Sequence, residues 1–172
     1  SSPSRGLGDV YKRQKEKCMS DIHTGGCFCG AVRYFTKGEP ARTAVCHCRY
    51  CQLRTGTAFG ISVYFKTDQV TFKDANLDTF SYETESGNKA ITSRCSNCGT
   101  TVSWRISIDA LKDFVGIAGG TFDPPTFWYD IKREVFTRSK ADFCQITSPE
   151  AYQDSPIYQP IRRDSGHLQG GT

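Results

Sequence analysis

Residues 25–30 read Gly-Gly-Cys-Phe-Cys-Gly, and two further groups of closely spaced cysteines follow them. Residues 46–51 read Cys-His-Cys-Arg-Tyr-Cys, and residues 94–99 read Arg-Cys-Ser-Asn-Cys-Gly. Together these groups hold seven of the nine cysteines in a chain of 172 residues. Cysteines so close together form strained disulfides with each other, because bridged Cα atoms normally lie about 4.4–6.8 Å apart in a specific geometry. The spacing therefore favours metal binding, with disulfides between different groups as the alternative.

The expected metal is zinc, at two ions per chain. Sites built only from thiolates suit zinc or iron–sulfur clusters, and we favour zinc. Residues 1–18 contain no apolar stretch typical of a secretory signal, so we expect a cytoplasmic location in which thiols stay reduced. No apolar run approaches the roughly 20 residues that span a bilayer, so we expect no membrane contact.

Two of the three groups can complete one closed site. Cys95 and Cys98 have the form of a zinc knuckle, and Gly99 behind them can adopt the backbone angles of its turn. Cys27 and Cys29 could supply the other two thiolates. Four thiolates leave no open coordination position, so this site is expected to be structural.

The remaining group offers three thiolates, from Cys46, Cys48 and Cys51, and no obvious fourth ligand. Three protein ligands with one exchangeable position are typical of a catalytic zinc site. The alternative is a structural site completed by water. His47 could be a ligand, but we expect it to support this loop or lie at the surface, because a residue between two chelating cysteines normally points away from the metal.

The rest of the sequence predicts a mainly β fold of small antiparallel sheets. Residues 57–65 alternate apolar and polar side chains and place Phe59, Ile61, Val63 and Phe65 on one face. Helix signals are weak, and residues 107–111 are the best candidate for a helical turn. Residues 119–125 should form an irregular loop. Further strands are expected at residues 31–35, 70–72, 80–82, 89–94, 101–106, 113–118 and 134–137.

The length and composition indicate a single domain with polar ends. Residues 1–18, which include Cys18, are interpreted as a non-native leader, residues 19–145 as the zinc-binding domain and residues 146–172 as a polar tail that ends in disorder. The net charge of the whole chain is +4, but it falls to +1 without residues 1–18. We therefore expect no nucleic-acid partner. The oligomeric state cannot be deduced.

Several other residues are expected to have roles in packing or to lie at the surface. Cys144 is expected to be a small buried core residue. The aromatic residues Trp104, Phe127, Trp128 and Tyr129 are expected to pack in the core and loops. Three arginines near the cysteines could bind carboxylates of a peptide thiol, but solvated surface positions are the preferred interpretation. These are Arg33, Arg49 and Arg54.

The three cysteine groups carry a resemblance to a known family. The order Gly25-Gly26-Cys27-Phe28-Cys29-Gly30-Ala31-Val32-Arg33-Tyr34, then Cys46-His47-Cys48-x-x-Cys51 with Gly56, then Cys95-x-x-Cys98-Gly99, resembles the glutathione-dependent formaldehyde-activating enzyme (GFA) family, which includes the centromere protein V group. The resemblance covers about residues 24–143. It implies a zinc-bound fold of small sheets, the β-tent, with Cys27, Cys29, Cys95 and Cys98 on a structural zinc and Cys46, Cys48 and Cys51 on a catalytic zinc.

The resemblance also implies a reaction and small-molecule partners. The reaction named for the family joins glutathione and formaldehyde to S-hydroxymethylglutathione. This chain would then be a zinc-dependent carbon–sulfur lyase acting on a thiol–aldehyde adduct. The alternatives are a non-catalytic zinc module that binds a thiol or a protein, and a metal store or redox sensor that uses the group of three cysteines.

Overall fold

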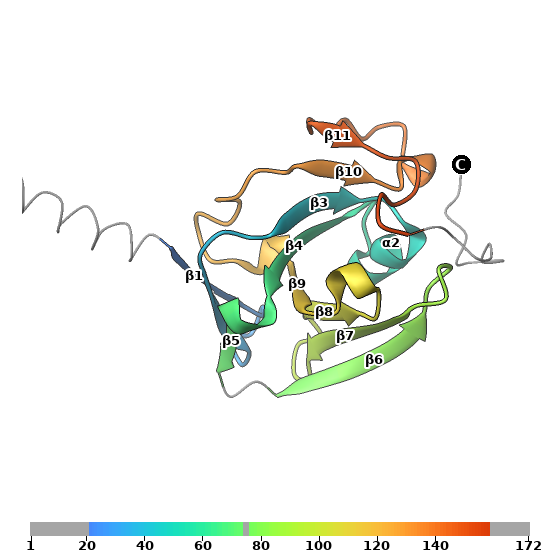
Figure 1. Ribbon diagram of the computed structural model, residues 1–172. Coiled ribbons are helices and arrows are strands. Elements are labelled where there is room, and N and C mark those ends of the chain that lie inside the picture. Colours follow the sequence, from blue (N-terminus) through green and yellow to red (C-terminus); the bar gives the residue numbers. More distant parts are fainter. Residues whose placement is uncertain (1–20, 74–75, 159–172) are drawn as a thin grey trace, which may run out of the picture.

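The computed structural model describes residues 21–73 and 76–158, in which most of the regular secondary structure is β-strand. The expectations for residues 1–18, Cys18 included, and for the extreme C-terminus lie outside the described residues. Figure 1 shows strands as the dominant element, with one short α-helix beside them. The elements are β1 (Ile22–Gly26), β2 (Arg33–Lys37), β3 (Arg42–Cys46), α2 (Arg49–Thr55), β4 (Gly60–Lys66), β5 (Val70–Lys73), β6 (Leu77–Glu83), β7 (Lys89–Cys95), β8 (Thr101–Ile106), β9 (Phe114–Ala118), β10 (Arg133–Val135) and β11 (Glu150–Ala151), with single 3₁₀ turns at Thr67–Gln69, Asp109–Leu111, Gly119–Thr121 and Thr137–Ser139.

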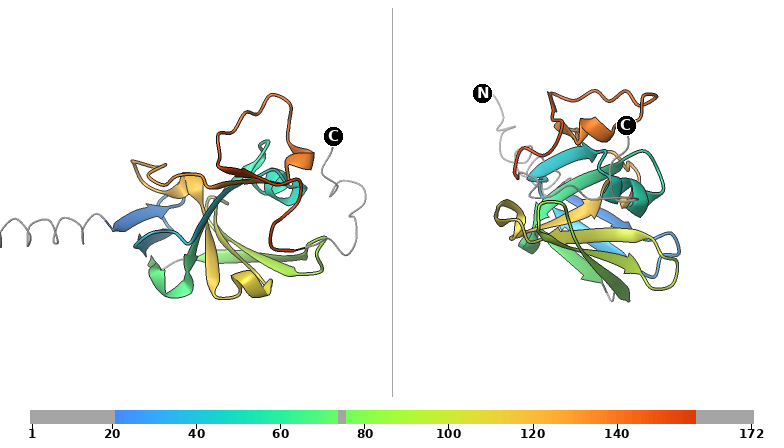
Figure 2. Two further views of the ribbon diagram at one scale, coloured as in Figure 1. Left: turned by 45° about the horizontal axis from the view of Figure 1, so that its top comes forward. Right: turned by 90° about the vertical axis from the view of Figure 1, so that its right-hand side faces the viewer.

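The strands form two sheets. The smaller has the order β1-β2-β5, and the larger has the order β11-β10-β3-β4-β9-β8-β7-β6. The larger sheet curls, so that β10 and β3 lie on one side of the molecule and β7 and β6 on the other (Figure 1, and Figure 2 in two further views). Helix α2 lies at one end of this curl. Twist accumulates from strand to strand in a sheet, which is why a sheet of this size does not stay flat.

Strand β4 separates the core from a cavity. On one face of β4, Val63 and Phe65 are fully buried and pack with Tyr34 of β2 and Ile117 of β9. Successive side chains of a strand point to opposite faces, so Ser62 and Tyr64 face the other way, into the cavity described below. The alternation expected over residues 57–65 is therefore confirmed for Val63 and Phe65, and Ile61 packs against the same core.

The predicted strands agree with the structure in most cases, and the differences have local causes. Strands β1, β3 and β11 are present but were not predicted, since they are short and only weakly alternating. The strand pairs are antiparallel as expected except at β10, which pairs in parallel with both β3 and β11. The turn expected at residues 107–111 is a 3₁₀ turn at Asp109–Leu111.

The α-helix is also a correction to the sequence prediction. Helix α2 has seven residues, too few for a sustained apolar stripe, and none of them is fully buried. The side chain of Cys48 caps its N-terminus by accepting a hydrogen bond from the Cys51 amide. Gly56 ends it with φ 66°, a left-handed conformation that favours glycine. No helix in the described part of the chain has the length and apolar character needed to cross a membrane.

Residues 146–158 continue along the domain. Strand β11 pairs with β10, and the backbone amide of Tyr152 donates to the carbonyl of Glu134 at 2.8 Å. The amide of Phe136 donates to the carbonyl of Asp154, whose carboxylate also pairs with Arg138. These contacts hold the described end of the chain against β10.

Candidate metal centres and the adjoining cavity

The first cluster joins two distant turns. Cys27 and Cys29 lie in the turn between β1 and β2, whereas Cys95 ends β7 and Cys98 follows it. All four sulfur atoms lie within 4.8 Å of one another. The Sγ atoms of Cys27 and Cys29 are 3.6 Å apart, and those of Cys29 and Cys95 are 3.8 Å apart. All eight cysteines in the described part of the chain are free thiols, so no disulfide competes with this grouping.

This geometry suits a tetrahedral zinc ion. Zinc–sulfur bonds of about 2.3 Å place neighbouring sulfurs of a tetrahedron about 3.8 Å apart. Polar groups also point at the sulfurs: the Val32 amide lies 3.2 Å from Cys27 Sγ, and Asn97 Nδ2 lies 3.2 Å from Cys29 Sγ. A hydrogen bond with the Thr100 hydroxyl, supported by backbone amides, lowers the pKa of Cys98 to about 5. Such contacts stabilise thiolates, which are the form that binds zinc.

The second cluster is built at one end of β3 and on the first turn of α2. Cys46 is the last residue of β3, Cys48 is the helix cap and Cys51 lies in the helix. Their sulfurs also lie within 4.8 Å of one another, so these three thiols could hold a metal with one position left for another ligand.

Gly60 allows the helix to approach this closely. It is the first residue of β4 and pairs with Cys46 on β3. A Cβ atom at this position would lie 2.9 Å from Arg54 Nη2 and 3.2 Å from Cys51 Cβ. A side chain at this position would displace the Arg54 guanidinium and push Cys51 by a few tenths of an ångström.

Arg54 contacts the second cluster directly. Its Nη2 lies 3.6 Å from Cys51 Sγ, and its guanidinium carbon lies 3.7 Å from the centre of the Trp104 ring. Hydrogen bonds from the Cys46 and Cys48 thiols lower the pKa of Cys51, and the charge of Arg54 lowers it further. The expectation of a solvated surface position was therefore wrong for Arg54. Once α2 is known, the i,i+3 spacing from Cys51 accounts for the contact.

Trp104 is held in place for this contact by strands β4 and β9. Its indole Nε1 donates to the Tyr64 hydroxyl at 2.8 Å. A Cβ on Gly116 of β9 would lie 2.4 Å from the same nitrogen, so the indole occupies the space that this glycine leaves. Trp104 is buried, but it also lines the cavity, so the expectation of packing alone was incomplete.

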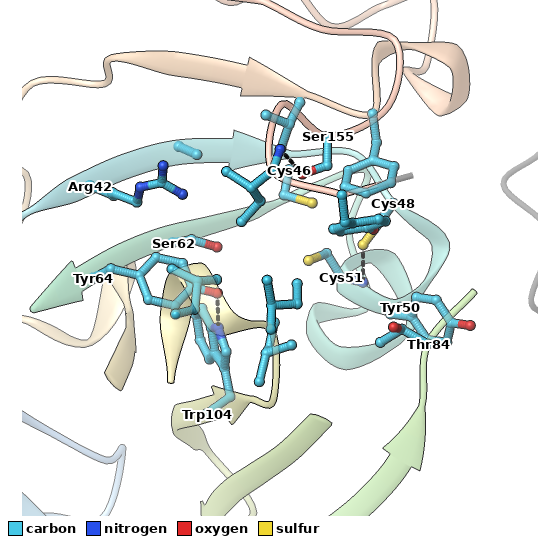
Figure 3. Close-up of a pocket in the computed structure, with 18 of the residues that line it drawn as sticks. Arg42, Cys46, Cys48, Tyr50, Cys51, Ser62, Tyr64, Thr84, Trp104 and Ser155 are labelled. Atoms are coloured by element: carbon cyan, nitrogen blue, oxygen red, sulfur yellow. Dashed lines mark hydrogen bonds between the residues drawn. The ribbon is translucent and has the colours of Figure 1, made fainter. Parts of the chain in front are cut away.

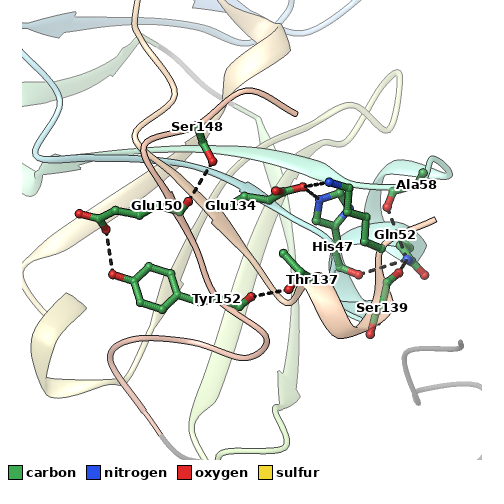
Figure 4. A network of polar contacts seen from close by, with 10 residues as sticks. His47, Gln52, Ala58, Glu134, Thr137, Ser139, Ser148, Glu150 and Tyr152 are labelled. Carbon is green, nitrogen blue, oxygen red and sulfur yellow. Dashed lines mark hydrogen bonds and ion pairs between the residues drawn. The ribbon is translucent and has the colours of Figure 1, made fainter. Parts of the chain in front are cut away.

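His47 lies in a buried polar network (Figure 4) and does not belong to the group of side chains that could hold a metal with the three thiols. Its side chain is fully buried, and Nε2 lies 2.8 Å from Glu134 Oε1. Lys140 Nζ approaches the same oxygen at 2.7 Å. Burial opposes the charge of Glu134, but hydrogen bonds from Lys140 and His47 outweigh it and lower the pKa of this carboxyl. The network ties the loop between β3 and α2 to β10, so His47 has a supporting position and not a surface one.

Gln52 strengthens the same loop from the helix side. Its Nε2 donates to the carbonyls of His47 at 3.1 Å and of Ser139 at 3.1 Å. One side chain therefore bridges the loop before α2 and the 3₁₀ turn after β10. Sequence analysis did not find Gln52 or Glu134, because no local pattern links residues so far apart in the chain.

A cavity of about 140 Å³ adjoins the second cluster (Figure 3). Cys46, Cys48 and Cys51 form one end of it. Its floor is the face of β3 and β4 that carries the paired residues Arg42 and Tyr64. The opposite wall comes from β8 and the turn that follows it, and a third wall is residues 155–158. Six aromatic side chains line the cavity: Tyr50, Tyr64, Tyr82, Trp104, Phe136 and Tyr158.

The other predicted packing residues are distributed as follows. Cys144 is buried, as expected, and Tyr129 belongs to the main core. Trp128 packs against that core and stacks on His23 with ring centres 3.4 Å apart. Phe127 is largely exposed, but its ring packs edge-on against Tyr129 with ring centres 6.3 Å apart, which agrees with loop packing. Of the remaining two arginines, Arg33 pairs with Asp123, and Arg49 lies near Gln52 on α2.

The fold and the two thiol clusters define a mainly β protein with sites suited to metal ions. Residues 22–139 match the sequence model of the family described as GFA, glutathione-dependent formaldehyde-activating enzyme. The chain belongs to this family, as the resemblance of its cysteine groups predicted.

Comparison with solved structures identifies a Rhodobacter sphaeroides protein whose crystal structure is known. It shares 20% sequence identity with this chain at a TM-score of 0.46, over 62% of this chain and 95% of that protein. No curated protein matches the sequence.

Proposed function

We propose that this chain is a zinc-dependent carbon–sulfur lyase that acts on a thiol–aldehyde adduct, such as the adduct of glutathione and formaldehyde that the family name implies. In this proposal Cys46, Cys48 and Cys51 hold the working zinc. The other four clustered cysteines hold a structural zinc and join the small sheet to β7. The observation that carries the proposal is that the three-thiol cluster forms one end of a cavity.

The proposed reaction is an addition and its reverse. The thiol sulfur attacks the aldehyde carbon, a carbon–sulfur bond forms and the π bond of the carbonyl breaks. The thiol proton ends on the carbonyl oxygen, so no oxidant or reductant is needed. Zinc bound at the three thiols would supply acidity to a substrate thiol and a fixed position for its sulfur.

The chain's own residues contribute charge and exclusion of water. Three thiolates and one divalent ion carry a net charge of −1, and the Arg54 guanidinium beside Cys51 offsets it. Trp104 and Tyr64 keep this guanidinium in place from the cavity side. The aromatic walls lower the local dielectric, which strengthens these charge interactions.

Exchange NMR tests the proposal. With zinc-loaded protein, exchange between formaldehyde, glutathione and S-hydroxymethylglutathione at equilibrium should be faster than the uncatalysed exchange. Cys51→Ser should return the rate to background. A wild-type protein with full zinc content and no acceleration would remove glutathione and formaldehyde as the substrate pair.

A second candidate is a zinc module that binds a thiol or a protein without catalysis. The donor set favours it, since three thiolates make zinc a weak Lewis acid. The same NMR experiment separates the two, because a binding module would broaden the thiol resonances without accelerating exchange.

A further inference from the structure

The cavity beside the three-thiol cluster is lined by basic side chains and, within the described residues, by no acidic one. Most of its lining side chains are aromatic or aliphatic, and none of the described residues that line it is Asp or Glu. Three arginines line it. Arg54 is engaged with Cys51 and Trp104, and Arg133 pairs with Glu150 at 2.7 Å.

Arg42 is the arginine that remains available. Within the described residues its guanidinium makes no hydrogen bond or ion pair with another side chain, and Figure 3 shows it in the cavity wall. The residue as a whole is half-buried, and a guanidinium beside apolar walls gains a charge-assisted hydrogen bond from an anionic partner. It is therefore placed to bind an anionic group of a ligand.

Arg42 and the thiol of Cys46 lie at opposite ends of strand β3. Arg42 and Cys46 are the first and last residues of β3, and alternation places both on the face that carries Ala44. Their Cα atoms are about 13 Å apart at the usual rise of a strand. The small Ala44 side chain and Ser62 opposite it leave the space between them open.

Glutathione does not match this arrangement. It carries an ammonium group, two carboxylates and two amides, and each needs a hydrogen-bonding partner when it is buried. The described lining offers no carboxylate for the ammonium group. It offers many aromatic faces for an apolar body instead.

We propose that the cavity takes a thiol, or its aldehyde adduct, with a compact aromatic or branched aliphatic body and one carboxylate, which Arg42 binds. The inference rests on the proposed use of the cavity as the thiol site. The sulfur lies at the cysteine end, the apolar body between the aromatic walls and the carboxylate at the Arg42 end.

The cavity wall formed by residues 155–158 makes this ligand preference specific to this chain. Residues 155–158 line the cavity but lie beyond residue 139, where the family match ends. Ile157 and Tyr158 add apolar surface to the wall. Family membership alone therefore does not determine the substrate that this wall admits.

Calorimetric titration of the zinc-loaded full chain tests the inference with three probes: 4-(sulfanylmethyl)benzoate, phenylmethanethiol and glutathione. The benzoate probe should bind at least about tenfold more tightly than glutathione, because a charge-assisted hydrogen bond and apolar burial both favour it. Zinc content measured after each titration checks that the thiols have not removed the metal. Glutathione binding as tightly as the benzoate probe, or more tightly, would overturn the inference.

Variants at Arg42 test the carboxylate assignment. Arg42→Gln should weaken binding of the benzoate probe by about tenfold and leave phenylmethanethiol unchanged, while Arg42→Lys should recover part of the loss. The matched control is Arg105→Gln, an exposed arginine on β8 whose contact is with Thr67. An equal loss for both aromatic probes in Arg42→Gln would contradict the assigned role.

Failure of this inference is distinguishable from failure of the lyase proposal. Preferred binding of the benzoate probe without accelerated exchange of its own formaldehyde adduct leaves the inference standing and removes the lyase. Accelerated exchange of glutathione adducts, together with tighter binding of glutathione than of the benzoate probe, supports the lyase and overturns the inference.

Discussion

The guanidinium of Arg54 lies 3.7 Å from the centre of the Trp104 ring while its Nη2 approaches Cys51 Sγ at 3.6 Å. The Arg54 guanidinium thus connects helix α2 with Trp104 of β8 and contacts the candidate metal ligand Cys51. Gly116 makes room for the indole and Gly60 makes room for the guanidinium. The electrostatics of the second cluster therefore depend on residues from four separate elements.

The contact predicts a role for Arg54 in metal retention. Arg54→Gln should weaken zinc binding at the three-thiol cluster by about 10- to 100-fold, the usual effect of losing a residue that supports a metal ligand. Competition with a coloured chelator measures this, with one zinc released more readily than the other. Arg105→Gln should match wild type, and equal retention in both variants would contradict the role.

Gly60 is predicted to set the position of α2. Gly60→Ala places a methyl group against Arg54 Nη2 and Cys51 Cβ, so it should destabilise the fold by about 1–3 kcal/mol and weaken the second zinc site. Chemical denaturation and zinc analysis measure the two effects. Gly120→Ala is the control, because no atom lies within 4 Å of the added carbon. Similar losses in both variants would exclude a specific role.

Loss of single cysteines should separate the two clusters. Cys46→Ser should leave one zinc per chain and a folded protein, because the four-thiol cluster is intact. Cys95→Ser should instead yield unstable or insoluble protein, since structural zinc contributes on the order of 10 kcal/mol to folding. Elemental analysis and circular dichroism measure both. Global unfolding of Cys46→Ser would contradict the division of roles.

Glu134 is predicted to make stability depend on pH. Its pKa is lowered in the fold from the ordinary 4.5, so the stability that it adds is present above about pH 4.5 and is lost as the pH falls through its folded value. Glu134→Gln should cost about 1–3 kcal/mol at pH 7, because Lys140 and His47 lose a charged partner. Denaturation at a series of pH values, at one zinc concentration, gives the difference between variant and wild type.

That difference should shrink as the pH falls below about 4.5. Glu39→Gln, at an exposed position, is the matched control and should follow wild type throughout. A difference that stays constant with pH would show that the charge of Glu134 is not the cause.

Local spacing was enough to predict that the cysteines form clusters able to hold metal ions. Chelation by close thiols and the two-residue period of strands are properties of neighbouring residues, and both are readable from the sequence. The three cysteine groups, the alternating strand around Val63 and the family all followed from such patterns. Helix α2 did not, because seven residues with a cysteine cap carry no helical apolar pattern.

Only the tertiary structure determined what surrounds the thiols. Arg54 meets Trp104, His47 meets Glu134, and residues 155–158 close the cavity because strands far apart in sequence pair in one curled sheet. That pairing depends on the summed burial and hydrogen bonding of the whole chain, which no local pattern records. The sequence by itself determined that the chain carries groups of thiols able to bind metal. The fold decided which thiols lie beside a cavity and which groups face them there.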